Sequence, residues 1–193
     1  MLPAVIIFFI FIAYPVVFNI FIGFHKWSGL GEPIWTGLKN YQKVFGDPAF
    51  KTVLKNFVFI TGLFVIFDCI FGMIIAVFVK MELKISKIAK VLIYLPVVLS
   101  PVIIGYTFRT LLEANNGIVN VLLRRIGLNG LAQQWLINPK FVLYVILMIL
   151  LWQGVGFAMI LYTAGISGIP STVYEAAEID GAGELKKFFY ITF

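Results

Sequence analysis

The chain has 193 residues, of which 61% are hydrophobic and 12% are charged, and its formal net charge is +6. Soluble globular domains contain roughly 45–50% apolar and 25% charged residues, so this composition excludes an ordinary water-soluble fold and predicts an integral membrane protein. The positive charge does not indicate a nucleic-acid partner, because the lysines stand in short clusters between apolar runs and not on a face interleaved with aromatic residues.

Four apolar runs have the length of a transmembrane helix, which needs about twenty mostly apolar residues. No basic residue precedes the first run and no small-residue cleavage site follows it, so we expect it to stay as a membrane anchor and not to act as a signal peptide. The runs are continuous and lack the alternation of barrel strands. The sequence therefore predicts an all-α polytopic membrane protein with helices at residues 2–24, 52–79, 91–112 and 141–163.

The connection after the first run is long and rich in aromatic residues. Residues 25–51 carry Trp27, Trp35 and Tyr41, which are typical of a membrane interface, and we expect an ordered loop against the membrane surface. The first helix and this loop make up the first expected region, residues 1–51. The second region, residues 52–193, contains the other membrane helices.

The connection at residues 80–90 is short and contains four lysines against one acidic residue. Such density is typical of a cytoplasmic loop. With this loop inside, six of the fifteen basic residues lie on the cytoplasmic side and nine on the other, so the raw count alone would favour the opposite orientation. Pro96 and Pro101 should kink the third helix, and the turn-rich residues 113–140 leave room for one short surface helix.

Residues 174–193 differ from the preceding chain, because charged residues and glycines interrupt the apolar pattern. Thr172 and Glu175 have the spacing of a capping box, which predicts a helix beginning near Val173. Gly181 is expected to end this helix in a left-handed conformation. From Ala182 a second amphipathic helix should follow, with an apolar side formed by Leu185, Phe188, Phe189 and Ile191. Taken alone, these features fit a solvated connection between two membrane helices.

The spacing within this stretch is specific. An EAA triplet is followed after three residues by a glycine, and after nine more by an isoleucine. This order resembles the coupling motif of permease subunits in bacterial binding-protein-dependent ABC importers, and EAAEIDGA resembles the extended motif of the sugar-importing branch. The residues that match are Glu175, Ala176, Ala177, Asp180, Gly181 and Ile191.

The resemblance extends over nearly the whole chain, and the similar proteins are permease subunits for oligosaccharides, glycerol-3-phosphate and related solutes. YPVVFNIFIGFHKW is similar to the family's first helix, LPVVLSPVIIGYTFR to its third, and LWQGVGFAMILYTAGISGIP to its fourth. The motif normally continues Ile-x-Leu-Pro, whereas here Ile191 and Thr192 are followed by Phe193. The resemblance therefore implies a type I (MetI-like) permease bundle of six helices that is C-terminally truncated in this sequence.

The resemblance implies a transport subunit and not an enzyme. In the family, two permease subunits pair, two ATPase subunits dock on the cytoplasmic side, and an extracytoplasmic solute-binding protein delivers solute at the bacterial cytoplasmic (inner) membrane. This chain has no G-x-x-x-x-G-K-[ST] motif, so ATP and Mg would be bound by the ATPase, and we expect no cofactor in this chain. The coupling helix, in the region of about residues 170–183, would enter a cleft of the ATPase. Glu175 would be its charged anchor, Ala176 and Ala177 its close-contact surface, and Gly181 the turn that fixes the second helix.

Polar residues inside the apolar runs are candidate functional groups, because charges there are rare. Asp68 either lines the solute path or pairs within the bundle, and Gln153 either bonds a sugar hydroxyl or joins two helices. Arg109 lies near the end of its run, where its side chain can reach the interface. His25 and the single Cys69 are interpreted as structural, and no residues cluster in the sequence as a metal site.

Other functions remain as alternatives. An ion-coupled secondary transporter should carry several acidic residues in its helices or two related halves, and only Asp68 is available. An intramembrane enzyme would need clustered histidines, cysteines or paired carboxylates. Within the ABC class, a permease for another solute such as an amino acid or phosphate is the runner-up, since the partner binding protein makes much of the choice of solute.

Overall fold

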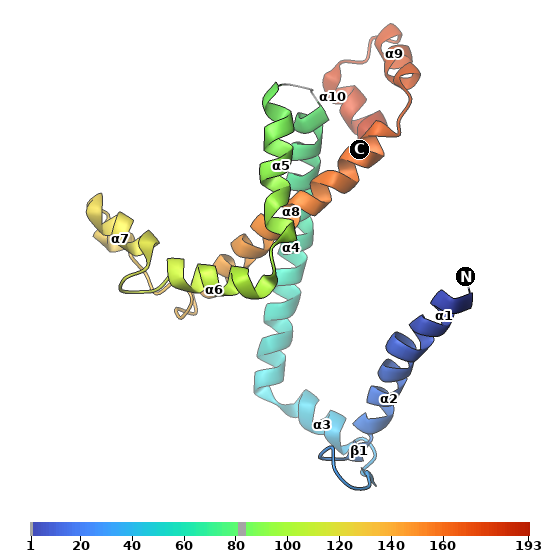
Figure 1. Cartoon of the computed structure of the whole chain (residues 1–193), viewed down its shortest axis with the longest axis vertical. Coiled ribbons are helices and arrows are strands. Elements are labelled where there is room, and N and C mark those ends of the chain that lie inside the picture. The colour runs from blue at the N-terminus through green and yellow to red at the C-terminus, as the bar shows by residue number, and fades with distance from the viewer. Residues whose placement is uncertain (1, 81–83) are drawn as a thin grey trace. The chain divides into compact units, whose positions relative to one another are not determined.

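The structure is a computed structural model that describes residues 2–80 and 84–193. Helices dominate the chain (Figure 1), which divides into two compact units, Met1–Val58 and Phe59–Phe193. In the described residues, three helices are long and apolar enough to cross a membrane, and a bent pair adds a fourth candidate if it counts as one span. A multi-pass membrane protein follows from these lengths.

The first unit begins with a helical run over Leu2–Gly23 that has a mean hydropathy of 2.7 and no buried residue. One wide turn interrupts it just before Pro15. A proline cannot donate to the carbonyl four residues earlier, and a π-helical turn is one way for a helix to accommodate this loss. The run consists of α1 (Leu2–Phe8), η1 (Phe9–Ala13) and α2 (Tyr14–Gly23).

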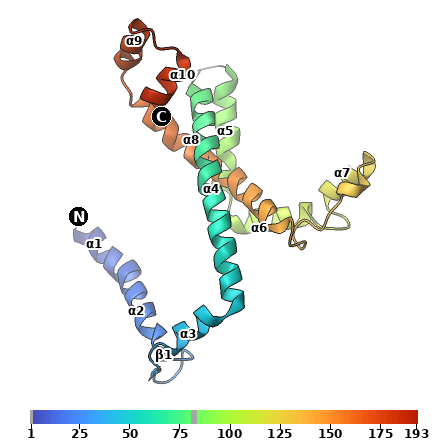
Figure 2. The same cartoon turned by 180° about the vertical axis from the view of Figure 1, so that it is seen from behind.

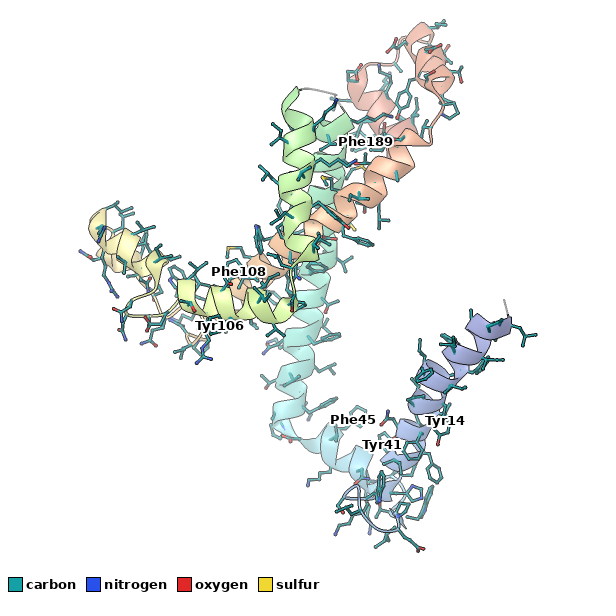
Figure 3. The ribbon with its side chains drawn as sticks, viewed as in Figure 1. Tyr14, Tyr41, Phe45, Tyr106, Phe108 and Phe189 are labelled. Atoms are coloured by element: carbon teal, nitrogen blue, oxygen red, sulfur yellow. The ribbon has the colours of Figure 1, made fainter. Side chains whose placement is uncertain are left out.

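A small antiparallel ribbon follows, in which β1 (His25–Lys26) pairs with β2 (Ile34–Trp35). The next helix, α3 (Lys39–Gly46), is tied to it by Asn40, whose amide donates to the carbonyls of Gly23 and His25 at 2.9 Å each. The hydroxyl of Tyr41, labelled in Figure 3, donates to a carbonyl of α2 at 3.4 Å. The expected ordered loop thus contains a ribbon and a helix.

Helix α4 (Pro48–Lys80) is 33 residues long and passes from the first unit into the second. It begins four residues before the expected position 52, because Asp47 and Pro48 form a start signal that hydropathy alone does not reveal. The Asp47 carboxylate accepts a hydrogen bond from the Ala49 N–H at 2.8 Å, and proline suits the first helical position.

The third apolar run, expected as one helix over 91–112 kinked by its prolines, is divided into two helices. The chain forms α5 (Lys84–Val98) and α6 (Pro101–Leu111), which are bent by 99° at the break. Ser100 has an extended conformation with ψ at 134°, as a residue before proline prefers, and the helix must stop there. In Figure 1, α6 turns away from α5 toward α7.

The lysine-rich stretch 80–90 is also not a loop throughout. Lys80 ends α4, and α5 already begins at Lys84, so only residues 81–83 separate the two helices, and these lie outside the described residues.

The segment after α6 is organised by a buried asparagine. Asn120 lies on α7 (Ile118–Arg125), the short helix that the sequence predicts, and is 1% exposed. Its amide donates to the carbonyls of Ala114 and Gln133, and its oxygen accepts from the N–H of Gln133 and the indole of Trp135. The one-turn helix η2 (Asn129–Leu131) lies between these partners in sequence.

Helix α8 (Val142–Ser167) packs against both α4 and α5, and the three segments appear together in Figures 1 and 2. The approach to α4 is close at Gly72, where an added Cβ would lie 2.6 Å from the Cβ of Ala158. Small residues at such crossings let two helix backbones approach closely. A buried cluster of Met73, Ala76 and Ile166 joins the ends of α4 and α8.

Candidate functional site

The stretch with the EAA motif forms two short helices after α8. The first, α9 (Ser171–Ile179), follows a turn that ends at Pro170. The expected capping box is not formed, since no side chain caps this helix. Pro170 takes the N-cap position with ψ at 140°, so the helix begins two residues before Val173 and includes Thr172. A residue inside the helix cannot have the extended backbone of an N-cap.

Gly181 ends α9 as the sequence predicts. Its φ is +75°, in the left-handed region that favours glycine. The Gly181 N–H donates to the carbonyl of Glu178 at 3.0 Å, and the Ala182 N–H donates to the carbonyl of Ala177 at 2.9 Å. This pair of bonds is a Schellman motif, which satisfies carbonyls that the end of a helix leaves free. The turn therefore fixes how the chain leaves α9.

The second short helix differs from the expectation. It starts at Glu184 and not at Ala182, and consists of α10 (Glu184–Lys187) and the π-helical turn η3 (Phe188–Thr192). Its expected apolar side is divided: Phe188 packs against the buried cluster of α4 and α8, whereas Leu185 is 76% exposed and Phe189, labelled in Figure 3, is 63% exposed.

None of the residues in α9 is buried, and only Tyr174 and Ala177 are half-buried. The motif residues Glu175, Ala176 and Asp180 are exposed. The structure thus gathers these residues on one accessible helix, while Ile191 lies apart on η3. Ile179, which the sequence did not single out, is the most exposed apolar residue of α9 at 87%. Its position four residues after Glu175 was the available signal.

Lys187 is a second residue that the sequence did not single out. It is only 7% exposed, and its Nζ lies 2.7 Å from Oε1 of Glu178 and 2.6 Å from Oε1 of Glu184. The hydrogen bond to Glu178, then that to Glu184, raises the pKa of Lys187 above its ordinary value. Only the i,i+3 spacing to Glu184 was visible in the sequence; the pairing with Glu178 depends on the Gly181 turn.

The two intramembrane candidates lie near the contact of α4 with α8. Oδ1 of Asp68 is buried and accepts no hydrogen bond within the described residues, and a Cβ added at Gly154 would lie 3.4 Å from it. The amide of Gln153 lies 3.5 Å from the carbonyl oxygen of Leu99, next to the break between α5 and α6. Of the two interpretations of Gln153, this contact favours joining helices.

The remaining polar residues singled out have ordinary surroundings. Arg109 is exposed in the last turn of α6. Nδ1 of His25 lies 2.8 Å from the carbonyl oxygen of Phe21, and its ring contacts Trp35 with centroids 4.9 Å apart. Within residues 2–80 and 84–193, no group of three or more histidines, cysteines and carboxylates could hold a metal ion.

A polar cavity of about 550 Å³ lies beside α7. Arg124 contributes to its wall and donates to the carbonyls of Ala114 and Asn115. In the turn between α6 and α7, hydrogen bonds from the backbone N–H groups of Asn116 and Asn115 lower the pKa of Glu113. The cavity is lined by Ala114, Asn115, Arg124, Ala132, Gln133, Gln134, Ile137, Asn138 and Pro139.

Residues 68–193 match the family described as "Binding-protein-dependent transport system inner membrane component". A probable ABC transporter permease protein of Pyrococcus horikoshii is 35% identical over 99% of this chain and 66% of its own length. The arabinooligosaccharides transport system permease protein of Bacillus subtilis is 30% identical over 98% of this chain and 60% of its own length. The chain thus spans less than the full length of these curated relatives.

Two crystal structures are similar over nearly all of this chain. A chain of a bacterial ABC transporter involved in the import of the acidic polysaccharide alginate gives a TM-score of 0.83 at 27% identity, covering 99% of this chain and 64% of that one. The bacterial alginate ABC transporter in complex with an alginate pentasaccharide-bound periplasmic protein gives 0.82 at 26% identity, with 99% and 63% covered. The similarity therefore includes both units and the α9–α10 region.

Proposed function

Because this chain belongs to the family of binding-protein-dependent transport system inner membrane components, we propose that it forms part of the membrane pathway of an ATP-driven importer for a carbohydrate or a related solute. The expected all-α importer-permease fold and the resemblance to the sugar-importing branch are confirmed by the structural similarity and by the sugar-transport relatives. Its proposed partners are a second permease subunit, two ATPase subunits and an extracytoplasmic solute-binding protein, at the bacterial cytoplasmic membrane.

The observation that carries the proposal is the form of α9. It is a nine-residue helix with no buried residue, and it ends in a Schellman motif. Gly181 defines the direction in which the chain leaves this helix. The small side chains of Ala176 and Ala177 let a partner surface approach closely, and exposed Glu175 can pair with a basic residue of that partner. This combination of an accessible face and a defined ending supports a role of α9 in docking.

In this proposal the ATPase subunit binds α9 and moves it as a rigid body, and the movement reaches α8 through the short turn at Gly168–Pro170. ATP and Mg belong to the ATPase, and this chain supplies the mechanical connection. Asp68 and Gln153 remain candidates for the solute path. Of the two, Asp68 is the stronger, because its buried oxygen accepts no hydrogen bond among the described residues.

The test is assembly and transport in proteoliposomes. The permease chain would be co-expressed with candidate ATPase and permease subunits of the same organism, and the amount of ATPase that co-purifies would be measured. We expect Glu175→Lys to reduce it, while Glu32→Lys, the same charge change at an exposed site in the first unit, leaves it unchanged. An equal yield of ATPase with Glu175→Lys would argue against docking through α9.

The solute class is tested separately with the partner binding protein. Direct binding of oligosaccharides, amino acids and phosphate would be compared by calorimetry, and we expect binding of a carbohydrate. Uptake that continues without ATP and stops with an ionophore would overturn the proposal in favour of an ion-coupled transporter.

A further inference from the structure

The end of α4 makes polar contacts with two elements far away in sequence. Nζ of Lys80 donates to the carbonyl of Ile166 at 3.0 Å, and it lies 5.2 Å from the centroid of the Tyr174 ring. Ile166 belongs to the last turn of α8, where the helix dipole favours a cation, and its carbonyl also accepts a hydrogen bond from the N–H of Ile169 at 3.3 Å. The Tyr174 ring belongs to α9, and a lysine ammonium within about 6 Å of an aromatic centroid is attracted by the ring.

Tyr174 has a central position among the side chains of α9. It is half-buried, and its hydroxyl forms a hydrogen bond of 2.9 Å with Oγ1 of Thr192 in η3. The same side chain thus contacts α4 through its ring and η3 through its hydroxyl. These two contacts can be separated experimentally, because phenylalanine keeps the ring and removes the hydroxyl.

The apolar cluster beside these contacts does not include α9. It is formed by residues of α4 and α8, with Phe188 of η3 packed against it. The peptide chain connects α9 to α8, but its contact with α4 must be made through side chains. Among the described residues, the Lys80–Tyr174 pair is the one ionic or aromatic contact that joins α9 to α4.

We propose that Lys80 and Tyr174 are positioning residues that transmit movement of α9 to α4, so that α4 and α8 respond together. Lys80 contacts the Ile166 carbonyl of α8 and the Tyr174 ring of α9 at once, and a displacement of α9 therefore changes a contact that all three helices share. This inference rests on the proposed function, because it assigns a role to the helix that the ATPase subunit would move.

The proposal predicts a loss of coupling with docking preserved. In the assembled importer in proteoliposomes, we expect Lys80→Met and Tyr174→Leu each to lower the solute transported per ATP hydrolysed by roughly two- to fivefold, the factor expected from one exposed cation–π contact. The double variant should lose no more than either single variant. Lys80→Arg and Tyr174→Phe should keep most of the coupling, since each preserves the cation or the ring.

Lys186→Met is the matched control, because it removes an exposed positive charge from the neighbouring helix α10. Normal coupling in both Lys80→Met and Tyr174→Leu would overturn the inference. So would a loss of ATPase co-purification in these variants, because it would make the pair a structural support of α9. If the unaltered chain does not bind an ATPase at all, the proposed function fails, and this outcome is distinct from the other two.

Discussion

Lys187 donates to Glu178 across the Gly181 turn at 2.7 Å, so that one ion pair holds α10 against α9. The lysine is nearly enclosed, whereas the carboxylate of Glu178 is largely in solvent with 64% of its side chain exposed. The short ionic contact and the Schellman motif therefore act together to define the geometry of the proposed docking helix.

Replacing Lys187 should loosen this pair of helices. Lys187→Met removes the partner of Glu178 and Glu184 and leaves two carboxylates close together, so we expect faster amide exchange at residues 181–187, measured by hydrogen exchange and mass spectrometry. Lys187→Arg should keep most of the protection, and Lys186→Met should keep all of it. Equal protection in Lys187→Met would show that the Gly181 turn alone fixes α10.

The same ion pair has a defined pH dependence. Because the folded state raises the pKa of Lys187, its contribution to stability is fully present below the ordinary lysine value of about 10.4 and is lost as the pH rises through the raised value. We expect constant protection between about pH 6 and 9 after correction for intrinsic exchange, and a decrease only at higher pH.

Gly181 should tolerate no branched side chain. In Gly181→Val the φ of +75° would place a β-branched residue in the left-handed region, at a cost of roughly 1–2 kcal/mol, and the helix end would rearrange. We expect normal membrane insertion but less co-purified ATPase. The matched control is Gly183→Val, because Gly183 has a φ of −69° and open space around it. Undiminished docking with Gly181→Val would count against the coupling assignment.

The crossing of α4 with α8 should depend on Gly72. Gly72→Leu would place a side chain against Ala158, where a Cβ alone would already lie 2.6 Å from that residue, and overpacking of this kind costs roughly 1–3 kcal/mol. We expect a lower unfolding temperature in detergent. Gly62→Leu lies in the same helix with nothing within 4 Å and should change the temperature little. An equal effect of the two variants would contradict the contact.

Asn120 should determine the stability of the segment around α7. Asn120→Leu leaves the N–H groups of Gln133 and Trp135 without an acceptor, at roughly 1–3 kcal/mol for each group that stays buried. We expect faster hydrogen exchange across residues 113–140. Asn129→Leu, at an exposed position in the same segment, is the control. Unchanged exchange in Asn120→Leu would mean that packing, and not this network, orders the segment.

The sequence was sufficient for features that depend on neighbouring residues alone. The apolar runs predicted membrane-length helices at the positions of Leu2–Gly23, α4 and α8, because a helix in lipid satisfies its own backbone hydrogen bonds. Gly181 was predicted as a left-handed helix end, because the backbone preference of glycine is local. Helix beginnings were less certain, as the unused capping box at Thr172 and the start of α4 at Pro48 show.

The angle between α5 and α6 could not be predicted from Pro96 and Pro101. Both prolines were expected to kink the helix, yet Pro96 lies inside α5 and the chain bends by 99° only before Pro101. The position of the bend depends on which groups surround the backbone carbonyls that the two prolines leave without a partner. Gln153 of α8 lies 3.5 Å from the carbonyl of Leu99 at this break, and such a contact between distant segments is decided by packing.

Local sequence was enough to predict a predominantly helical membrane protein and the position of its motif, because hydropathy, glycine conformation and motif spacing depend on neighbouring residues. The contacts of its charged side chains, in contrast, depend on how distant segments pack. Lys80 and Lys187 were equivalent in the sequence as basic residues beside the membrane, but Lys80 contacts α8 and Tyr174, while Lys187 is buried and pairs with two largely exposed glutamates. The contact of Lys80 with Ile166 joins residues 86 positions apart, and only the packing of α4 on α8 brings them together.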